Sequence, residues 1–199
     1  MTASVVRLFS EGEQPLQETH LHTNDPGLFG PNSVSWKVMG DVSSFVGGVR
    51  ALLLQALHPE VAAGVADHSQ YKTDPLGRLN RTSFFVTTVN YGAMPEVQEA
   101  VAVVRAAHKP VSGTSERGIA YSANQPQLGA WVQNTLTDSF LDAYQNFCQP
   151  LEPKDADRFV LEQSKIGELL GISELPLTAR ELREWITEHP QLGLSLIHI

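Results

Sequence analysis

The residues of this chain most able to do chemistry lie on apolar helical faces. One such face carries, at intervals of three or four residues, Val97, Val101, Val104 and His108. The preceding segment carries, at the same intervals, Arg78, Thr82, Phe85 and Val89. A histidine or an arginine on such a face is costly to bury unless it meets a ligand, an ion or a hydrogen-bond partner. Both faces are therefore candidates for a binding site.

Two further histidines extend this set and leave two chemistries open. His68 continues another apolar face, and His58 precedes a proline at which a helix must bend. In the first chemistry, His108 is the axial ligand of a haem iron, and cationic groups bind the propionates at the haem edge. In the second, the three histidines hold a non-haem metal together with Glu60 or Asp67.

Each of these side chains also has an ordinary structural explanation. A single histidine on an apolar face is most often hydrogen-bonded within the core. Arg78 and Arg81 could extend to solvent, or pair with Asp67 or Asp74. Periodicity alone leaves ligand and structural roles open.

Prolines, glycines and capping residues divide the chain into the helices that would carry these groups. Seven segments combine helical periodicity with such signals: 42–57, 60–69, 75–91, 95–108, 126–147, 153–170 and 179–189. Only in the run "VTTV" at 86–89 do the β-branched residues favour a strand over a helix. A short hairpin arm is expected near residue 120. We therefore predict an all-α fold, a single helical domain of about seven helices.

Composition restricts the partners and the compartment. The formal net charge is −8 and no stretch gathers Lys and Arg, which argues against nucleic acid. We expect no secretory signal and no transmembrane segment, because no apolar run has the required length. The single Cys148 cannot form an internal disulfide and is typical of a cytoplasmic protein. The oligomeric state stays open.

Five segments follow one another in an order typical of one family. They are "GPNSVSWKVMGD", "GGVRALLLQALHPEVAAGVADHSQY", "DPLGRLNRTSFFVTTVNYG", "VRAAHKPVSG" and "YSANQPQLGAWVQNTLTDSFLDAYQNF". Over roughly residues 27–190, the chain resembles the MpaB-type oxygenases, relatives of the rubber oxygenase latex clearing protein. The resemblance implies an all-α oxygenase with haem b that uses O₂ on an unsaturated or lipophilic, isoprenoid-like substrate.

The resemblance also implies roles for residues already singled out. The family has an arginine, a threonine four residues later and a histidine on the next helix, which Arg78, Thr82 and His108 match. His108 would then be the iron ligand, and Arg78, Thr82 and Arg81 the catalytic residues. Arg81 stands where latex clearing protein has a lysine that can ligate iron; a guanidinium cannot, so an open sixth position is expected. The residues expected to bind the cofactor are His108, Arg78, His58 and His68.

Some features depart from the family pattern. Met39 and Gln133 stand where many members have histidine. We expect an irregular segment at 1–33 and the helical domain at 34–193. The last six residues, 194–199, resemble a translated sequencing adaptor, so we expect a non-native tail and a domain truncated at its C-terminus. The alternatives are a non-catalytic helical protein that binds haem or a lipophile, and a non-haem metal enzyme using His58 and His68.

Overall fold

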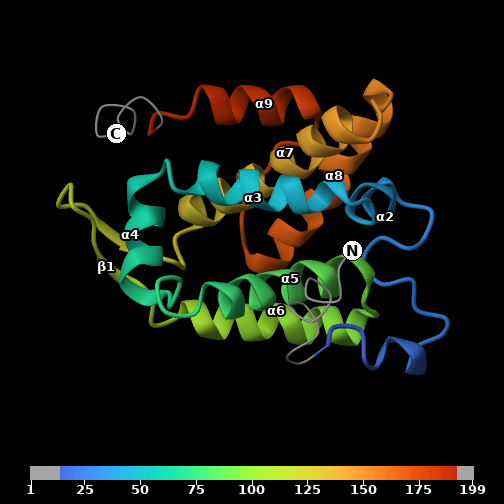
Figure 1. Cartoon of the computed structure of the whole chain (residues 1–199), viewed down its shortest axis with the longest axis horizontal. Helices are drawn as coiled ribbons and strands as arrows, with labels where there is room; N and C mark the ends of the chain where they lie inside the picture. The colour runs from blue at the N-terminus through green and yellow to red at the C-terminus, as the bar shows by residue number, and fades with distance from the viewer. Residues whose placement is uncertain (1–13, 192–199) are drawn as a thin grey trace.

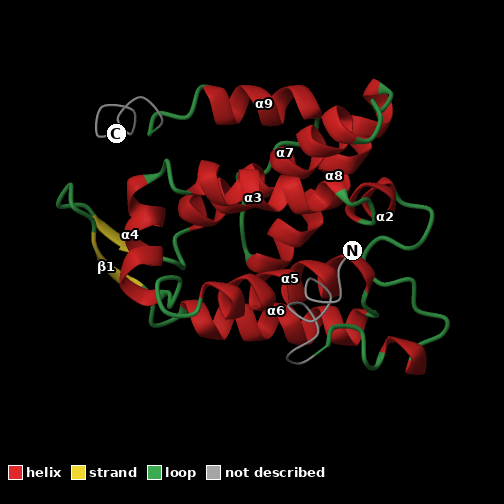
Figure 2. Ribbon diagram, in the orientation of Figure 1, coloured by secondary structure: helices red, strands yellow, loops and turns green. Residues whose placement is uncertain are grey.

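The computed structural model describes residues 14–191 and confirms the all-α prediction (Figures 1 and 2). The helices are, in chain order, the 3₁₀ helix η1 (Thr19–Leu21), α2 (Val34–Met39), α3 (Ser43–Gln55), α4 (Pro59–His68), α5 (Pro75–Tyr91), α6 (Met94–His108), α7 (Pro126–Phe147), α8 (Pro153–Leu170) and α9 (Ala179–Thr187). Strands β1 (Ser112–Thr114) and β2 (Ala120–Ser122) pair antiparallel in a small hairpin. All seven expected helices are present, and the expected tail lies outside the described residues.

Helix α2 is the main element that the sequence analysis did not place. Its first backbone N–H groups are satisfied partly from another helix, because the Glu162 carboxylate of α8 accepts from Ser35 N at 2.7 Å. The hydroxyl of Ser33 caps the same end by accepting from Trp36 N. Six residues are too few for a periodic pattern, and the partner that stabilises them is 127 residues away in the chain.

The β-branched run at 86–89 is helical rather than a strand. It forms part of α5, and its members Thr88 and Val89 are buried. Val89 packs in an apolar cluster with residues of α6 and α8. Burial of one helical face therefore outweighs the local β-propensity of the run.

Helix α7 passes through the centre of the fold and is buried along most of its length. It contacts α2, α3, α4, α8 and α9, and Trp131 in its first turns is fully buried. In Figure 1, α9 lies above this group, and α5 and α6 form a separate pair below it, side by side. Within the described part of the chain, no helix is both long and apolar enough to cross a membrane.

Two adjacent glycines of α3 allow the packing against α7 to be tested. A Cβ at Gly47 would lie 2.8 Å from Phe140 Cδ1 and 2.9 Å from Ser139 O, whereas a Cβ at Gly48 would meet nothing within 4 Å. Gly47→Ala should lower the free energy of unfolding by about 1–3 kcal/mol, because α3 must move away from α7. Gly48→Ala should raise it by about 0.4–1 kcal/mol, since alanine is the better helix former. Denaturant unfolding of both variants measures this, and equal effects would contradict the packing described.

Candidate functional site

The two apolar faces predicted from the sequence meet between α5 and α6. The helices run antiparallel and are joined by residues 92–93. Near this connection Val89 of α5 clusters with Val97 and Val101 of α6, and Phe85 packs against them. The part of each face that lies close to the connection is therefore a shared core.

The polar members of these faces lie at the opposite end of the helix pair. Arg78 precedes the end of α5 at Tyr91 by 13 residues, and His108 follows the start of α6 at Met94 by 14. At about 1.5 Å per residue, both lie about 20 Å from the connection. Because α5 and α6 run antiparallel, side by side (Figure 1), the positions of Arg78 and His108 in the chain place both at the end of the pair remote from residues 92–93. Thr82 lies one turn nearer the connection.

His108 has a fixed backbone and an unengaged ring. Its carbonyl accepts from Val111 N at 3.0 Å and from Asn124 Nδ2 at 3.2 Å. No other residue between 14 and 191 hydrogen-bonds to its imidazole, and the side chain is exposed. Desolvation by the surrounding protein lowers the pKa of His108 below its ordinary value. The lowered pKa favours the neutral ring, and the side chain is accessible; metal binding needs both.

Arg78 is half-buried and has no counter-ion among the described residues. Burial lowers the pKa of Arg78, while the neighbouring Tyr71 acts in the opposite direction. A guanidinium stays protonated in proteins, so the group keeps its charge. A half-buried cation without an acidic neighbour is a favourable place for an anionic ligand group.

Arg81 and Thr82 are engaged locally. Arg81 is exposed, and its Nη1 lies 3.4 Å from Oδ2 of Asp74, one of the surface pairings anticipated from the sequence. The hydroxyl of Thr82 donates to the carbonyl of Arg78 at 3.0 Å and is also exposed. Of the three polar residues expected on α5, only Arg78 therefore keeps all of its side-chain donors free of other described residues.

His68 contacts the hairpin. Its Nε2 lies 3.0 Å from the carbonyl oxygen of Ser112 in β1, and its ring meets Tyr121 of β2 edge to face. The hydroxyl of Tyr121 donates to Asp67, so the last turn of α4 holds both strands. The sequence suggested an arm near residue 120, but its pairing with α4 depends on tertiary packing that periodicity does not report.

His58 lies in a buried aromatic cluster. The residue is 5 % exposed, and its ring centroid is 5.8 Å from that of Trp131 and 5.6 Å from that of His189. His189 in turn lies 4.8 Å from Trp185 of α9, centroid to centroid. Desolvation lowers the pKa of His58 to about 4, and the neighbouring charge of Glu60 only partly opposes this.

Glu60 is a structural carboxylate in this fold. It is buried, and it accepts hydrogen bonds from Ser115 Oγ at 2.9 Å and from Arg117 Nη2 at 3.0 Å. Both donors belong to the turn of the hairpin, so Glu60 fixes this turn to the start of α4. Between residues 14 and 191, no three His, Cys, Asp or Glu side chains are grouped closely enough to hold a metal ion. The described residues thus provide no ligand set for the non-haem metal alternative.

The two departures from the family pattern lie in the core. Met39 belongs to the apolar cluster around Phe140 and Phe159. Gln133 is buried in α7 and donates to the carbonyl of Gln163 at 3.1 Å. Both side chains have packing or hydrogen-bonding roles there.

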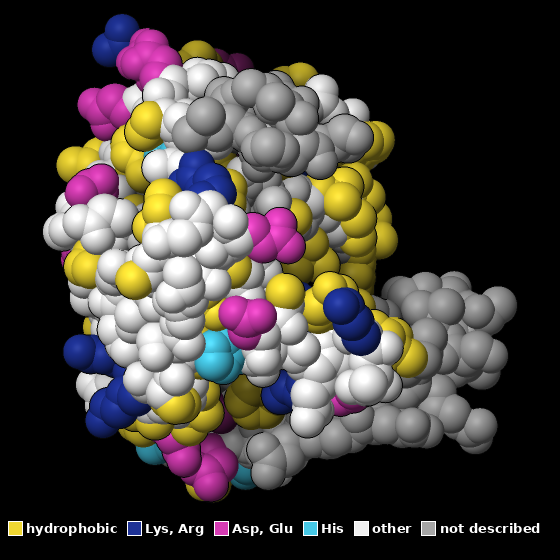
Figure 3. All heavy atoms as spheres, turned by 90° about the vertical axis from the view of Figure 1, so that its left-hand side faces the viewer, with side chains coloured by type: hydrophobic (Ala, Val, Ile, Leu, Met, Phe, Trp, Pro, Cys, Tyr) yellow, Lys and Arg dark blue, Asp and Glu magenta, His cyan; other side chains and the backbone are white. Residues whose placement is uncertain are grey.

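Apolar side chains are exposed beside Arg78 and along α3. In the first turns of α5, Leu76 is 48 % and Leu79 is 37 % exposed. The outer side of α3 adds a row of exposed residues, namely Val42, Val46, Val49 and Leu53. Figure 3 shows hydrophobic side chains gathered along the upper right-hand edge of the view. The exposed apolar side chains of α3 and of the first turns of α5 are suited to contact apolar ligands.

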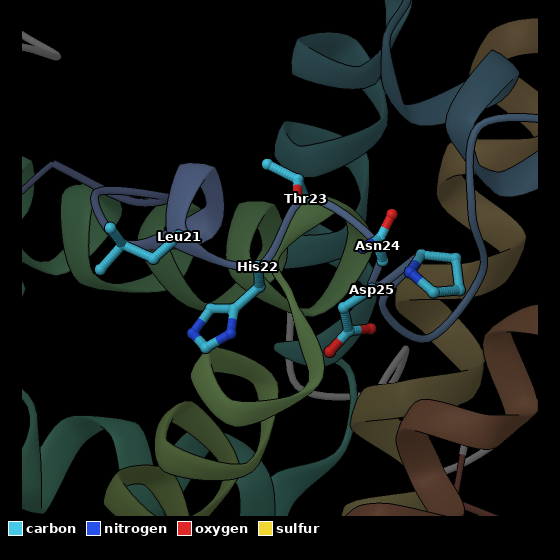
Figure 4. A pocket seen from close by; sticks show the side chains of 6 residues that line it. Leu21, His22, Thr23, Asn24 and Asp25 are labelled. Carbon is cyan, nitrogen blue, oxygen red and sulfur yellow. The ribbon is translucent and has the colours of Figure 1, made fainter.

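The hollow drawn in Figure 4 is a different feature. It is lined by residues 21–26, and in the close-up the side chains of Leu21 and His22 lie apart from that of Asp25. Asp25 Oδ2 accepts from Met94 N at 2.9 Å, so this loop caps the start of α6. The hollow lies at the end of α6 remote from His108.

The buried His58 gives a pH-dependence of stability. Because its pKa is about 4 when folded and about 6.5 when unfolded, the unfolded chain binds more protons below pH 6.5. The free energy of unfolding should thus fall by up to about 3 kcal/mol as the pH decreases from 7 to 4 on account of this group. His58→Gln should flatten this slope in urea titrations at several pH values. A slope unchanged in the variant would contradict the burial of a neutral ring.

Comparison with protein families places these observations in context. The model of the catalytic domain shared by the ER-bound oxygenase mpaB/B′ and rubber oxygenase matches residues 36–195, which is most of the chain. No curated protein and no solved structure matches. The match spans α2 to α9 and so includes Arg78, Thr82 and His108. The chain belongs to the mpaB and rubber oxygenase catalytic-domain family.

Proposed function

We propose that this protein is a haem-dependent oxygenase that oxidises an unsaturated or lipophilic substrate with O₂. The observation that carries the proposal is the pair formed by His108 and Arg78. A neutral, accessible imidazole and a half-buried arginine without a counter-ion occupy the same end of the α5–α6 pair. Membership of an oxygenase family supports the reaction class.

The residues present fit haem b. His108 would ligate the iron through its unengaged ring, and Arg78 would bind a propionate carboxylate through a charge-assisted bond. The exposed leucines at 76 and 79 would contact the apolar part of the ligand. When bound, the haem iron would supply the activation of O₂.

The chain's own residues would orient the reactants. Arg81 is held at the surface by Asp74 and carries no lone pair, so it would not ligate the iron. Thr82 donates to the Arg78 carbonyl, so its oxygen lone pairs remain available as acceptors on the same face. The exposed apolar side chains of α3 and α5 favour a lipophilic substrate over a charged one. The free thiol of Cys148 is compatible with the reducing cytoplasm, where we place the reaction.

The role of His108 predicts a spectroscopic result. His108→Ala should abolish the Soret band that the full chain acquires on reconstitution with haem, because the iron loses its protein ligand. The matched control is His68→Ala, which removes a surface histidine bound to the hairpin backbone and should keep most of the band. Normal haem binding by His108→Ala would refute the proposal. A wild type that binds haem but consumes no oxygen in single-turnover measurements would identify a carrier instead.

The role of Arg78 predicts a change in affinity. Arg78→Ala should weaken haem binding by about tenfold or more, since one charge-assisted hydrogen bond is worth about 1.5–3 kcal/mol. Arg78→Lys should recover part of this loss, because it retains the charge without the fork of donors. Arg180→Ala on α9 removes an exposed arginine and serves as the control. Haem titrations followed by absorbance give the three affinities, and a wild-type value for Arg78→Ala would exclude the residue from the site.

A further inference from the structure

The end of α6 that carries His108 has little core packing. Val101 is the last buried residue of the helix, and none of residues 102–109 is buried. Packing therefore fixes the direction of α6 only up to Val101, two turns before His108. The orientation of the final turn must come from interactions other than apolar burial.

Hydrogen bonds from the hairpin region supply this constraint. Asn124 Nδ2 donates to the His108 carbonyl at 3.2 Å, and Ala123 N donates to the carbonyl of Val111 at 2.9 Å. The carbonyl of His108 is one of the last in α6, so no backbone N–H within the helix can donate to it, and it is suited to accept donors from outside the helix. Val111 N completes the pair of donors to this carbonyl.

Asn124 is itself well anchored. It lies between β2 and the start of α7, the most extensively buried helix described. Its backbone N–H donates to Ser122 Oγ at 3.3 Å, and the backbone N–H of Ser122 donates to Gln125 Oε1 at 3.1 Å. The hairpin before it is fixed to α4 through the buried Glu60 and through Tyr121. The amide of Asn124 thus connects the hairpin, which is fixed to α4, to the turn of His108, in which no residue is buried.

We propose that Asn124 is a positioning residue that sets the direction of the His108 imidazole. This inference rests on the proposed function insofar as the imidazole is to bind iron. Asn124 does not touch the cofactor; it acts by holding the carbonyl, and with it the backbone, of the residue that would. Groups that hydrogen-bond the ring of a metal-binding histidine commonly contribute 10–100-fold to metal affinity, and a donor to the backbone carbonyl, which acts one step further from the ring, is expected to contribute less.

The test compares four variants of the full chain. Asn124→Ala removes the donor, Asn124→Asp keeps the shape but places a carboxylate against the carbonyl, and Asn124→Gln keeps an amide donor. The matched control is Asn146→Ala, because Asn146 Nδ2 also donates from an exposed side chain to a helix carbonyl, that of Asp142, at 2.8 Å in α7. The melting temperature of each variant is first compared with that of the wild type, so that a change at His108 is not mistaken for unfolding.

The first measurement needs no cofactor. Asn124→Ala and Asn124→Asp should shift and broaden the ring-proton NMR signals of His108, as the last turn of α6 loses its constraint. Asn146→Ala should leave these signals unchanged, and Asn124→Gln should restore them in part. His108 signals in Asn124→Ala identical to those of the wild type would overturn the proposal.

The second measurement is haem binding. Asn124→Ala should weaken the affinity by up to about tenfold, the lower limit for partners of the ring itself, and change the ligand-field bands of the ferric protein, whereas Asn146→Ala should do neither. If Asn124→Ala and wild type bind haem alike while His108→Ala does not, the positioning role is wrong and the proposed function stands. If the wild type binds no haem but the NMR signals respond, the function is wrong and the link between Asn124 and His108 stands.

Discussion

The packing of α7 at the centre of the fold is the constraint on which the remaining elements depend. This helix buries polar as well as apolar residues, so each polar group needs a partner. Asp138 is 3 % exposed, and its Oδ2 lies 2.7 Å from Arg50 Nη1 of α3. Arg183 of α9 also lies 3.4 Å from Asp138, and Arg50 also lies 3.3 Å from Asp142, so the buried carboxylate belongs to a network of charges that joins α3, α7 and α9. The salt bridge and the close approach at Gly47 together fix α3 against α7.

The same anchoring explains why the candidate site lies at the periphery. Helices α3, α8 and α9 are held to α7, whereas α5 and α6 pack mainly on each other. Their shared core ends near Phe85 and Val101, so the last turns around Arg78 and His108 remain accessible. A ligand needs this accessibility, but it leaves the position of His108 dependent on hydrogen bonds from the hairpin. The hairpin is in turn held by the buried Glu60, which connects the site to the rest of the molecule.

The elements that the sequence predicted are those whose signals are local. Proline at the first helical position predicted α5 and α7, and the apolar spacing predicted the faces through which α5 and α6 pack on each other. Helix α2 could not be predicted, because its start is stabilised by Glu162 from far along the chain. For the same reason spacing did not reveal that His68 contacts the hairpin or that His58 is buried beside Trp131. Periodicity identifies a face, but the partner of that face is decided by the tertiary fold.

A histidine at the C-terminal end of a helix meets two opposing influences. The helix dipole favours the imidazolium by about 0.3–1 kcal/mol at exposed sites, whereas metal binding needs the neutral ring. Two donors, Val111 N and Asn124 Nδ2, satisfy the carbonyl of His108 and so reduce the partial negative charge presented at this end. Desolvation then lowers the pKa of His108 in spite of the dipole. Desolvation thus favours the neutral ring, while the hydrogen bonds to the carbonyl constrain the backbone of the last turn of α6.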